Sequence, residues 1–118
     1  MTPIFVFGSN LAGRHGKGAA LWAKHHRGAI QGRGEGPQGS SYAIPTKDGN
    51  LRVLPLKKIA VYVGWFLTYA RAHPELIFEL TPIGCGLAGY RPEDIAPLFL
   101  DAPPNVITPA QFDPVLRP

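Results

Sequence analysis

The sequence predicts a compact three-layer α/β/α domain, with helices on both faces of one sheet. Short apolar runs typical of strands alternate with longer runs of helical periodicity along the chain. Two of the apolar runs end in glycine-rich loops that lead into a predicted helix. A chain of 118 residues is long enough to bury a core of its own, so we expect a single domain over residues 1–118.

The first half of the chain alternates between strand and helix patterns. An apolar and aromatic run predicts a buried strand at residues 3–8. Residues 17–27 predict a helix, because they are rich in strong helix formers and Gly28 can end it. Glycines crowd residues 30–39, which predicts an irregular loop that is either a plain turn or a segment folded over a ligand. A short strand is predicted at residues 40–45.

The longest helix is predicted at about residues 55–73, where Pro55 suits the first position and Pro74 ends the pattern. Apolar residues three and four positions apart form its core stripe, which consists of Leu56, Ile59, Val63, Phe66 and Ala70. A second, aromatic stripe consists of Tyr62, Trp65 and Tyr69. The aromatic stripe either belongs to the core or packs against another subunit, so a homo-oligomer through this helix is one alternative.

The last third of the chain adds a strand, a helix and a tail. The strand is predicted at residues 76–82. A short helix is predicted at residues 92–100, because its opening proline and acidic residues suit a helix N-terminus. Residues 101–118 form a proline-rich C-terminal tail with room for one edge strand at 105–107.

Composition and charge narrow the function classes. Hydrophobic residues make up 45% of the chain and charged residues 17%, which is ordinary for a globular protein. No apolar run approaches the ~20 residues of a membrane helix and no signal-peptide pattern opens the chain, so we expect a cytoplasmic protein without a membrane partner. Cys85 is the single cysteine and no side chains have metal-ligand spacing, so we expect no disulfide, metal or cofactor. The formal charge of +4 reflects either a solvated basic face or an anionic partner, such as a phosphate compound or nucleic acid.

Two glycine-rich loops have the physical properties of a phosphate site. The first spans residues 8–18 and the second spans residues 84–90, and each lies between a predicted strand and a predicted helix. Such loops bring bare backbone N–H groups to the carboxyl end of a strand, where a helix N-terminus adds partial positive charge. Lys47 also follows a predicted strand. Because ligands of α/β sheets bind outside the carboxyl ends of the strands, we expect both loops and Lys47 to line one cleft.

Three motifs, at residues 83–87, 42–47 and 10–20, together resemble the macrodomain family, which binds ADP-ribose. Ile-Gly-Cys-Gly-Leu at residues 83–87 resembles the second phosphate loop of macrodomains. Tyr-Ala-Ile-Pro-Thr-Lys at residues 42–47 resembles a strand that ends in a Thr-Lys pair, as in the branch that removes ADP-ribose from acidic side chains and in the antitoxins of DNA-ADP-ribosylating toxins. Asn10 and the glycines that follow it resemble the first macrodomain loop. The resemblance covers most of residues 4–99 and implies a macrodomain-like fold.

The resemblance implies a role for each residue at these positions. Asn10 would contact the distal ribose, and the backbone of both loops would hold the diphosphate. Lys47 would be catalytic, with its amine acting at the anomeric carbon of the distal ribose. The ligand-binding residues implied in this way are Asn10, Gly13, Gly16, Lys17, Gly18, Gly84, Cys85, Gly86 and Leu87.

Two features depart from the family pattern. The chain starts too late to contain the Gly-Asp pair that reads the adenine amino group in typical macrodomains, which leaves adenine specificity open. Ala88 stands where the side-chain hydrolases carry an Asp, although the antitoxin members use the lysine without it. Asp48 would either replace that acid or only shape a turn. The plain structural alternatives are a solvated Lys47 and a Cys85 that merely fits between two glycines.

The sequence therefore predicts binding of ADP-ribose or a related nucleotide diphosphate, either free or attached to a nucleic acid or a protein. Three functions stand as hypotheses. The first is an ADP-ribosyl glycohydrolase that acts through Lys47, and the second is a non-catalytic module that binds a nucleotide signal. The third is a small basic nucleic-acid-binding protein, although the chain has no basic motif interleaved with aromatic residues.

Overall fold

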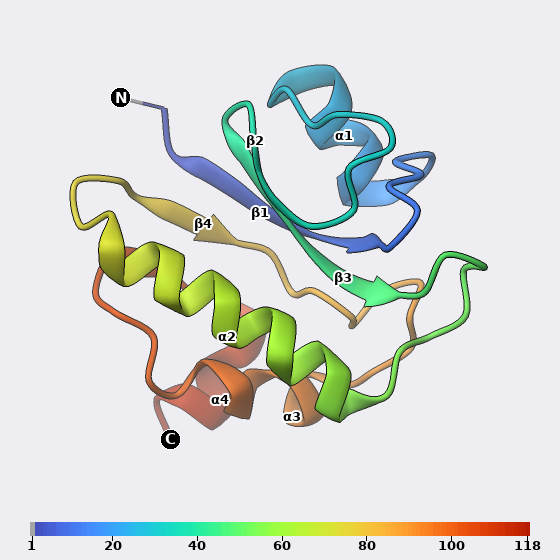
Figure 1. Ribbon diagram of the computed structural model, residues 1–118. Coiled ribbons are helices and arrows are strands. Elements are labelled where there is room, and N and C mark those ends of the chain that lie inside the picture. Colours follow the sequence, from blue (N-terminus) through green and yellow to red (C-terminus); the bar gives the residue numbers. More distant parts are fainter. Residues whose placement is uncertain (1) are drawn as a thin grey trace.

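The computed structural model describes residues 2–118, and Met1 lies outside the described residues. The described residues form one five-stranded mixed sheet with helices around it (Figure 1). The strands are β1 (Ile4–Asn10), β2 (Gly36–Gln38), β3 (Ser41–Lys47), β4 (Phe78–Leu80) and β5 (Val106–Ile107). They lie side by side in the order β2-β3-β1-β4-β5. Only β2 is antiparallel to its neighbour, whereas β3, β1, β4 and β5 run parallel. The carboxyl ends of these four strands therefore lie along one edge of the sheet.

Helices lie against both faces of this sheet, and the predicted α/β class is confirmed. The helical elements are α1 (Gly18–His26), α2 (Leu56–Ala72), α3 (Pro92–Ile95), the 3-10 turns η1 (Ala96–Phe99) and η2 (Ala110–Phe112), and α4 (Asp113–Leu116). α1 lies on one side of the sheet, whereas α2, α3 and α4 lie on the other (Figure 1). Within residues 2–118, no helix has both the length and the hydropathy that a membrane span requires.

The two faces of the sheet bury cores of different size. Side chains alternate along β1, so that Val6 packs on the α2 side whereas Phe7 packs on the α1 side. The α2 side holds a cluster of 17 buried apolar residues. The α1 side holds a cluster of 5, of which four are alanines. Most of the apolar surface that the fold removes from water therefore lies between the sheet and α2.

α2 buries the predicted core stripe. Four of the five stripe residues are buried and Leu56 is half-buried, while Leu67 is buried as well. In the aromatic stripe, Tyr62 and Tyr69 pack against the margin of the core, whereas Trp65 is 54% exposed. The aromatic stripe is thus divided between the core and the surface.

β3 continues two residues beyond its predicted end at Pro45. Pro45 has no N–H to donate, yet it is fully buried and pairs with Ser9. The register of the β1–β3 ladder shifts directly after this pair, and pairing resumes between Asn10 and Lys47. The missing donor is therefore accommodated by a shift in register, and the strand does not end there.

β2 lies within residues 30–39, and the prediction of an irregular loop is wrong for Gly36–Gln38. Glycine and proline have low strand propensity, so the local sequence carries no strand signal. The strand exists because it pairs with β3, and its outer position in the sheet tolerates Pro37. The buried amide of Gln38 fixes the segment further by donating to the carbonyl of Arg33 at 3.0 Å.

The other predicted elements are present with somewhat different bounds. The predicted strand at 76–82 is shorter, since only Phe78–Leu80 pair within the sheet. The predicted helix at 92–100 divides into α3 and η1. The strands predicted at 3–8, 40–45 and 76–82 all lie in one sheet, as expected.

The C-terminal tail folds back onto the α2 side of the molecule. It contains the predicted edge strand, β5, and two elements that the sequence does not predict, η2 and α4. Phe112 is fully buried and its ring stacks on that of Phe99 with centroids 6.0 Å apart. Short segments between prolines show no helical periodicity, so this anchoring depends on tertiary contacts.

One buried amide joins the tail to the end of α2. Asn105 is 8% exposed, and its Nδ2 donates to the carbonyls of Ala70, His73 and Leu76 at 3.0, 3.1 and 3.1 Å. The Ala70 and His73 carbonyls also accept from the N–H groups of His73 and Leu76 at 3.2 and 3.0 Å, so this amide adds a second donor at the end of α2 and in the turn after it. Its own carbonyl accepts from the N–H of Phe78, which ties the same residue to β4.

We expect Asn105→Ala to lower the free energy of unfolding by about 1–3 kcal/mol, because the hydrogen bonds from this buried amide to three carbonyls would be lost. Urea unfolding measures this change. Asn105→Asp should be destabilised as well, since a carboxylate cannot donate to the three carbonyls. Asn50→Ala, which removes an exposed amide, is the matched control and should unfold as the wild type does. Equal stability of the Asn105 and Asn50 variants would contradict the capping role.

Candidate functional site

One cavity opens at the edge of the sheet where the parallel strands end, and its volume is about 820 Å³. β1 contributes residues 8–10, and the loop into α1 contributes Arg14 and residues 16–20. The end of β3 contributes residues 46–47, and the loop after β4 contributes residues 81–88. Three further residues complete the lining, namely Leu51, Pro92 and Gln111.

The cavity brings together every predicted site residue except Gly13. Asn10, Lys47 and the predicted residues of the second loop all line it, as do Gly16, Lys17 and Gly18. Gly13 does not line the cavity, because its role is in packing. Its φ is +69°, and a Cβ there would lie 2.3 Å from the backbone N of Arg33. Only glycine permits that approach of two backbones.

Backbone donors without partners line the cavity from two sides. Among residues 2–118, the N–H groups of residues 16–20 have no hydrogen-bond acceptor, and α1 begins without a side-chain cap. In the second loop, the same holds for the N–H groups of Gly84, Gly86, Leu87 and Ala88. Such donors, together with the positive end of the α1 dipole, favour a bound anion.

The charged side chains at the cavity are all cationic. Arg14, Lys17 and Lys47 line it, and none of the ion pairs formed within residues 2–118 involves them. Within the described residues 2–118, no Asp, Glu or His side chain lines the cavity. Three cations in one concave site, without carboxylates to balance them, produce a positive potential that attracts anionic ligands.

Lys47 and Asn10 lie side by side because β1 and β3 pair in parallel. The two residues are partners in the ladder, and the carbonyl of Lys47 also accepts from the N–H of Leu11 at 3.0 Å. The Asn10 amide closes the first loop, since its Nδ2 donates to the Arg14 carbonyl and its Oδ1 accepts from the Arg14 N–H, both at 2.9 Å. Asn10 therefore shapes the loop and faces the cavity at the same time.

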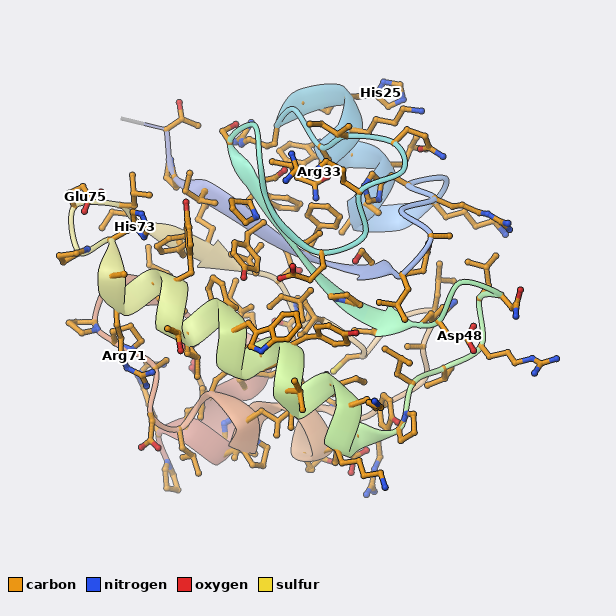
Figure 2. All side chains as sticks on the ribbon, in the orientation of Figure 1. His25, Arg33, Asp48, Arg71, His73 and Glu75 are labelled. Atoms are coloured by element: carbon orange, nitrogen blue, oxygen red, sulfur yellow. The ribbon has the colours of Figure 1, made fainter. Side chains whose placement is uncertain are left out.

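Asp48 lies in the turn after β3 and shapes it (Figure 2). It does not line the cavity. Its Oδ1 accepts from the backbone N–H groups of Asn50 and Arg52 at 2.8 and 2.9 Å. This turn holds Leu51 at φ +63°, a left-handed conformation that is uncommon for a residue with a side chain. Leu51 reaches the cavity from this turn. The turn role considered for Asp48 is thus the one observed.

Residues 30–39 support the first loop from behind and contribute nothing to the cavity lining. His15 is fully buried, with its Nε2 3.0 Å from the Arg33 carbonyl and its ring edge-on to Phe7. Ser9 Oγ donates to the carbonyl of Gly34. The structure therefore shows a packed support, and not a segment folded over the site.

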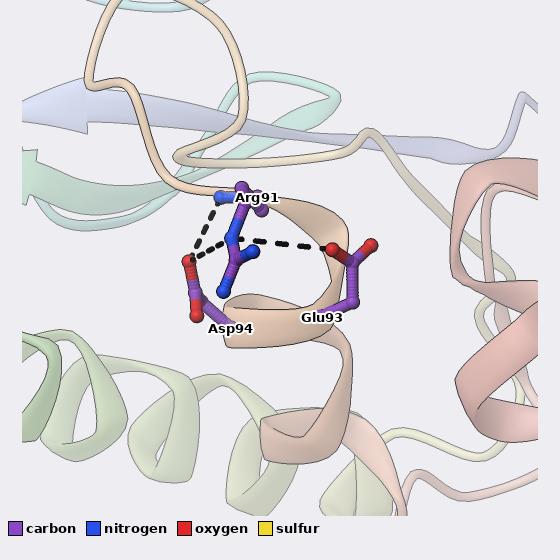
Figure 3. A network of polar contacts seen from close by, with 3 residues as sticks. All are labelled: Arg91, Glu93 and Asp94. Atoms are coloured by element: carbon purple, nitrogen blue, oxygen red, sulfur yellow. Dashed lines mark hydrogen bonds and ion pairs between the residues drawn. The ribbon is translucent and has the colours of Figure 1, made fainter.

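The second loop is closed by contacts within it and by the start of α3. The N–H of Tyr90 donates to the Gly84 carbonyl at 2.8 Å, where Gly84 has φ +73°. At the start of α3, the N–H of Arg91 donates to Asp94 Oδ2 at 3.0 Å (Figure 3). Arg91 Nε lies 3.6 Å from Asp94 Oδ2 and 4.0 Å from Glu93 Oε2. The backbone hydrogen bond and the Arg91 side chain hold the pKa of the Asp94 carboxyl below its usual value.

Cys85 lacks the environment of a nucleophilic cysteine. Burial raises the pKa of its thiol, and the nearby carboxylates of Asp94 and Glu93 raise it further. A thiol with a raised pKa carries less thiolate at neutral pH, and the thiolate is the reactive form. This favours the interpretation of Cys85 as a small residue that fits between two glycines.

Sequence reasoning missed several residues that line the cavity. Thr46 and Thr81 stand at strand ends, and their hydroxyls donate to the carbonyls of Ser9 and Val6 at 3.3 and 2.7 Å. Position after a strand was the signal that could have identified them. Gln111 has no such signal, because it reaches the cavity only through the folding of the tail.

No three His, Cys, Asp or Glu side chains in residues 2–118 come together to hold a metal ion. No protein-family model matches the chain, and comparisons with curated proteins and with solved structures gave no significant match. The cavity and its chemistry therefore carry the functional argument.

We expect Cys85 to react with a disulfide reagent more slowly at pH 7 than an unperturbed thiol does. Because its pKa is raised, the rate should still increase with pH above about 8.5, the ordinary cysteine value. Glu93→Gln removes one of the carboxylates responsible and should shift the rate profile to lower pH. Glu75→Gln removes an exposed carboxylate elsewhere and should leave the profile unchanged. A rate that levels off below pH 8 in the wild type would show that Cys85 is activated.

Proposed function

We propose that this chain is a macrodomain-like protein that binds ADP-ribose or a related nucleotide diphosphate. The three-layer arrangement of that fold is proposed with it, formed by α1, the sheet and the layer of α2, α3 and α4. One observation carries the proposal: both glycine-rich loops and Lys47 line a single cavity, and the loops offer unpartnered backbone donors there.

The electrostatics and size of the cavity support a phosphate-containing ligand. The loops with free donors follow β1 and β4, which are neighbours in the sheet, so their N–H groups can reach a diphosphate from two sides. Three cations stand around them with no competing carboxylate. A volume of about 820 Å³ lies within the usual range of small-molecule sites.

The lining also favours a nucleotide over a nucleic-acid strand. Proteins that bind single strands stack successive bases on aromatic side chains. In the part of the chain that the structure describes, residues 2–118, no Phe, Tyr or Trp lines this cavity. An ADP-ribosylated nucleic acid or protein remains a suitable partner, because only its ADP-ribose group would have to enter the site.

Lys47 is the residue that we propose for hydrolysis of an ADP-ribosyl bond. Its amine would attack the anomeric carbon as the bond to the acceptor breaks, and water would then release ADP-ribose from the lysine. The departing acceptor would take its proton from solvent, since no carboxylate or His lines the cavity. General acid–base assistance is typically worth ~10²–10⁴-fold, so turnover should be slow.

Binding is tested by a side chain placed into the cavity at Gly86. A Cβ at Gly86 would meet no atom within 4 Å, and its φ is not in the left-handed region, so Gly86→Val should fold. We expect the wild type to bind ADP-ribose with a micromolar or weaker dissociation constant, about −8 kcal/mol, and to bind a short oligonucleotide more weakly. Gly86→Val should abolish binding in calorimetry, because valine would occupy the space of the diphosphate.

Gly49→Val is the matched control for this test. Gly49 also has open space around its Cβ position but does not line the cavity, so this variant should bind as the wild type does. Absence of ADP-ribose binding by the wild type, or equal binding by Gly86→Val, would overturn the proposed function.

Catalysis is tested by release of ADP-ribose from modified DNA and from modified acidic side chains. Lys47→Ala should lose turnover but keep its affinity within about tenfold, because the loops hold the ligand. Lys47→Arg should also fail, since a guanidinium stays protonated and cannot attack. No release by the wild type would favour the non-catalytic binding module. Equal release by the wild type and Lys47→Ala would assign the chemistry to another residue.

A further inference from the structure

The neutral polar side chains of the cavity differ in whether they are free to bind a ligand. The hydroxyls of Ser9, Thr46 and Thr81 each donate to a backbone carbonyl. Both polar atoms of the Asn10 amide are bonded to the backbone of Arg14. Gln111 also lines the cavity, and its amide makes no hydrogen bond within residues 2–118. Gln111 is therefore the amide of this lining that is free at both its donor and its acceptor.

Gln111 enters the cavity from the β5 side of the sheet, whereas Lys47 enters it from the β3 side. Lys47 ends β3, whereas Gln111 follows β5, and the order β3-β1-β4-β5 separates the two strands by three strand spacings. Three spacings of about 4.8 Å amount to about 14 Å. The loops with free backbone donors follow the two central strands, β1 and β4. A ligand with a diphosphate in its middle would therefore reach Lys47 with one end and Gln111 with the other.

The backbone that carries Gln111 is firmly held. The neighbouring Phe112 is fully buried, and its N–H donates to the Pro109 carbonyl at 3.0 Å. Behind it, Arg117 pairs with Asp113 at 2.8 Å and donates to Thr108 Oγ1 at 3.3 Å. An exposed side chain on a fixed backbone is suited to reading a ligand, because only the side chain and not the backbone has to be ordered on binding.

We propose that Gln111 is a specificity-determining residue that reads the hydrogen-bonding edge of the nucleobase. This inference rests on the proposed nucleotide-diphosphate function. A glutamine amide offers a donor next to an acceptor, which pairs with the adjacent 6-amino group and ring nitrogen of adenine. Rotated by 180°, the same amide pairs with the carbonyl and N–H of hypoxanthine. A carboxylate, which only accepts, could not form both pairs with either base.

The test combines three ligands with one variant in calorimetry. The ligands are ADP-ribose, its hypoxanthine counterpart and 1,N6-etheno-ADP-ribose, in which the 6-amino donor is blocked. The wild type should bind the first two within about threefold of each other, because both form the same number of hydrogen bonds. It should bind the etheno compound about tenfold more weakly.

Gln111→Ala should bind ADP-ribose and the hypoxanthine counterpart about fivefold to tenfold more weakly than the wild type, and the etheno compound unchanged. Gln111 is exposed, so this variant should fold. Asn50→Ala removes an exposed amide outside the cavity and should bind all three ligands as the wild type does.

The experiment distinguishes failure of the nucleotide-diphosphate function from failure of the role assigned to Gln111. If the wild type binds none of the three ligands, the nucleotide-diphosphate function itself is wrong. If the wild type binds ADP-ribose and Gln111→Ala binds it equally well, the site stands but Gln111 does not read the base. A loss of affinity in Gln111→Ala that is the same for all three ligands would also overturn the assignment, because it would show a contact outside the base.

Discussion

The parallel pairing of β1 with β3 on one side and β4 on the other is the constraint on which the candidate site depends. Parallel strands end at the same edge of a sheet, so three segments far apart in sequence arrive at one place. The pairing of Asn10 with Lys47 sets the position of the lysine relative to the first loop. Sliding β3 by one residue would turn every side chain of that strand to the opposite face and remove this arrangement.

The chemistry of the cavity comes mostly from the backbone and from long cations. Nine unpartnered N–H groups on residues 16–20, 84 and 86–88 outnumber the polar side chains that are free to bind. Backbone donors are fixed once the loops are folded, whereas lysine and arginine side chains remain adaptable. The folded site therefore combines an anion cradle of backbone donors, which the loops hold in place, with mobile charges around it. Without carboxylates in the lining, an anionic ligand would have to supply the opposite charge itself.

Sequence patterns predicted the parts of the fold that local chemistry determines. The apolar spacing of α2 and the runs of β1 and β4 could be recognised because each is buried by a periodic pattern. The predicted cleft could be placed because glycine loops and Lys47 follow strands.

The features that the sequence did not show all depend on a partner distant along the chain. β2 contains glycine and proline and exists through its pairing with β3. Pro45 remains inside β3 because the neighbouring ladder shifts its register. Gln111 enters the cavity because Phe112 is buried next to it, and nothing in the residues around it signals that contact. Edge pairing and tail docking are tertiary effects that a local pattern does not encode.

The cores on the two faces of the sheet differ in size, and this difference determines which of the two glycine-rich loops lies on the more easily opened part of the domain. The second loop is continuous with the large cluster around α2, whereas the first loop leads into α1, whose Ala20 and Ala23 pack in the small cluster with Phe7 and two further alanines. Regions with few buried apolar contacts open locally at a lower free energy than the rest of the domain. The first half of the anion cradle is thus built on the more easily opened part of the molecule. A ligand that bridges both loops would couple this part to the rigid half, so that occupancy and local order would rise together.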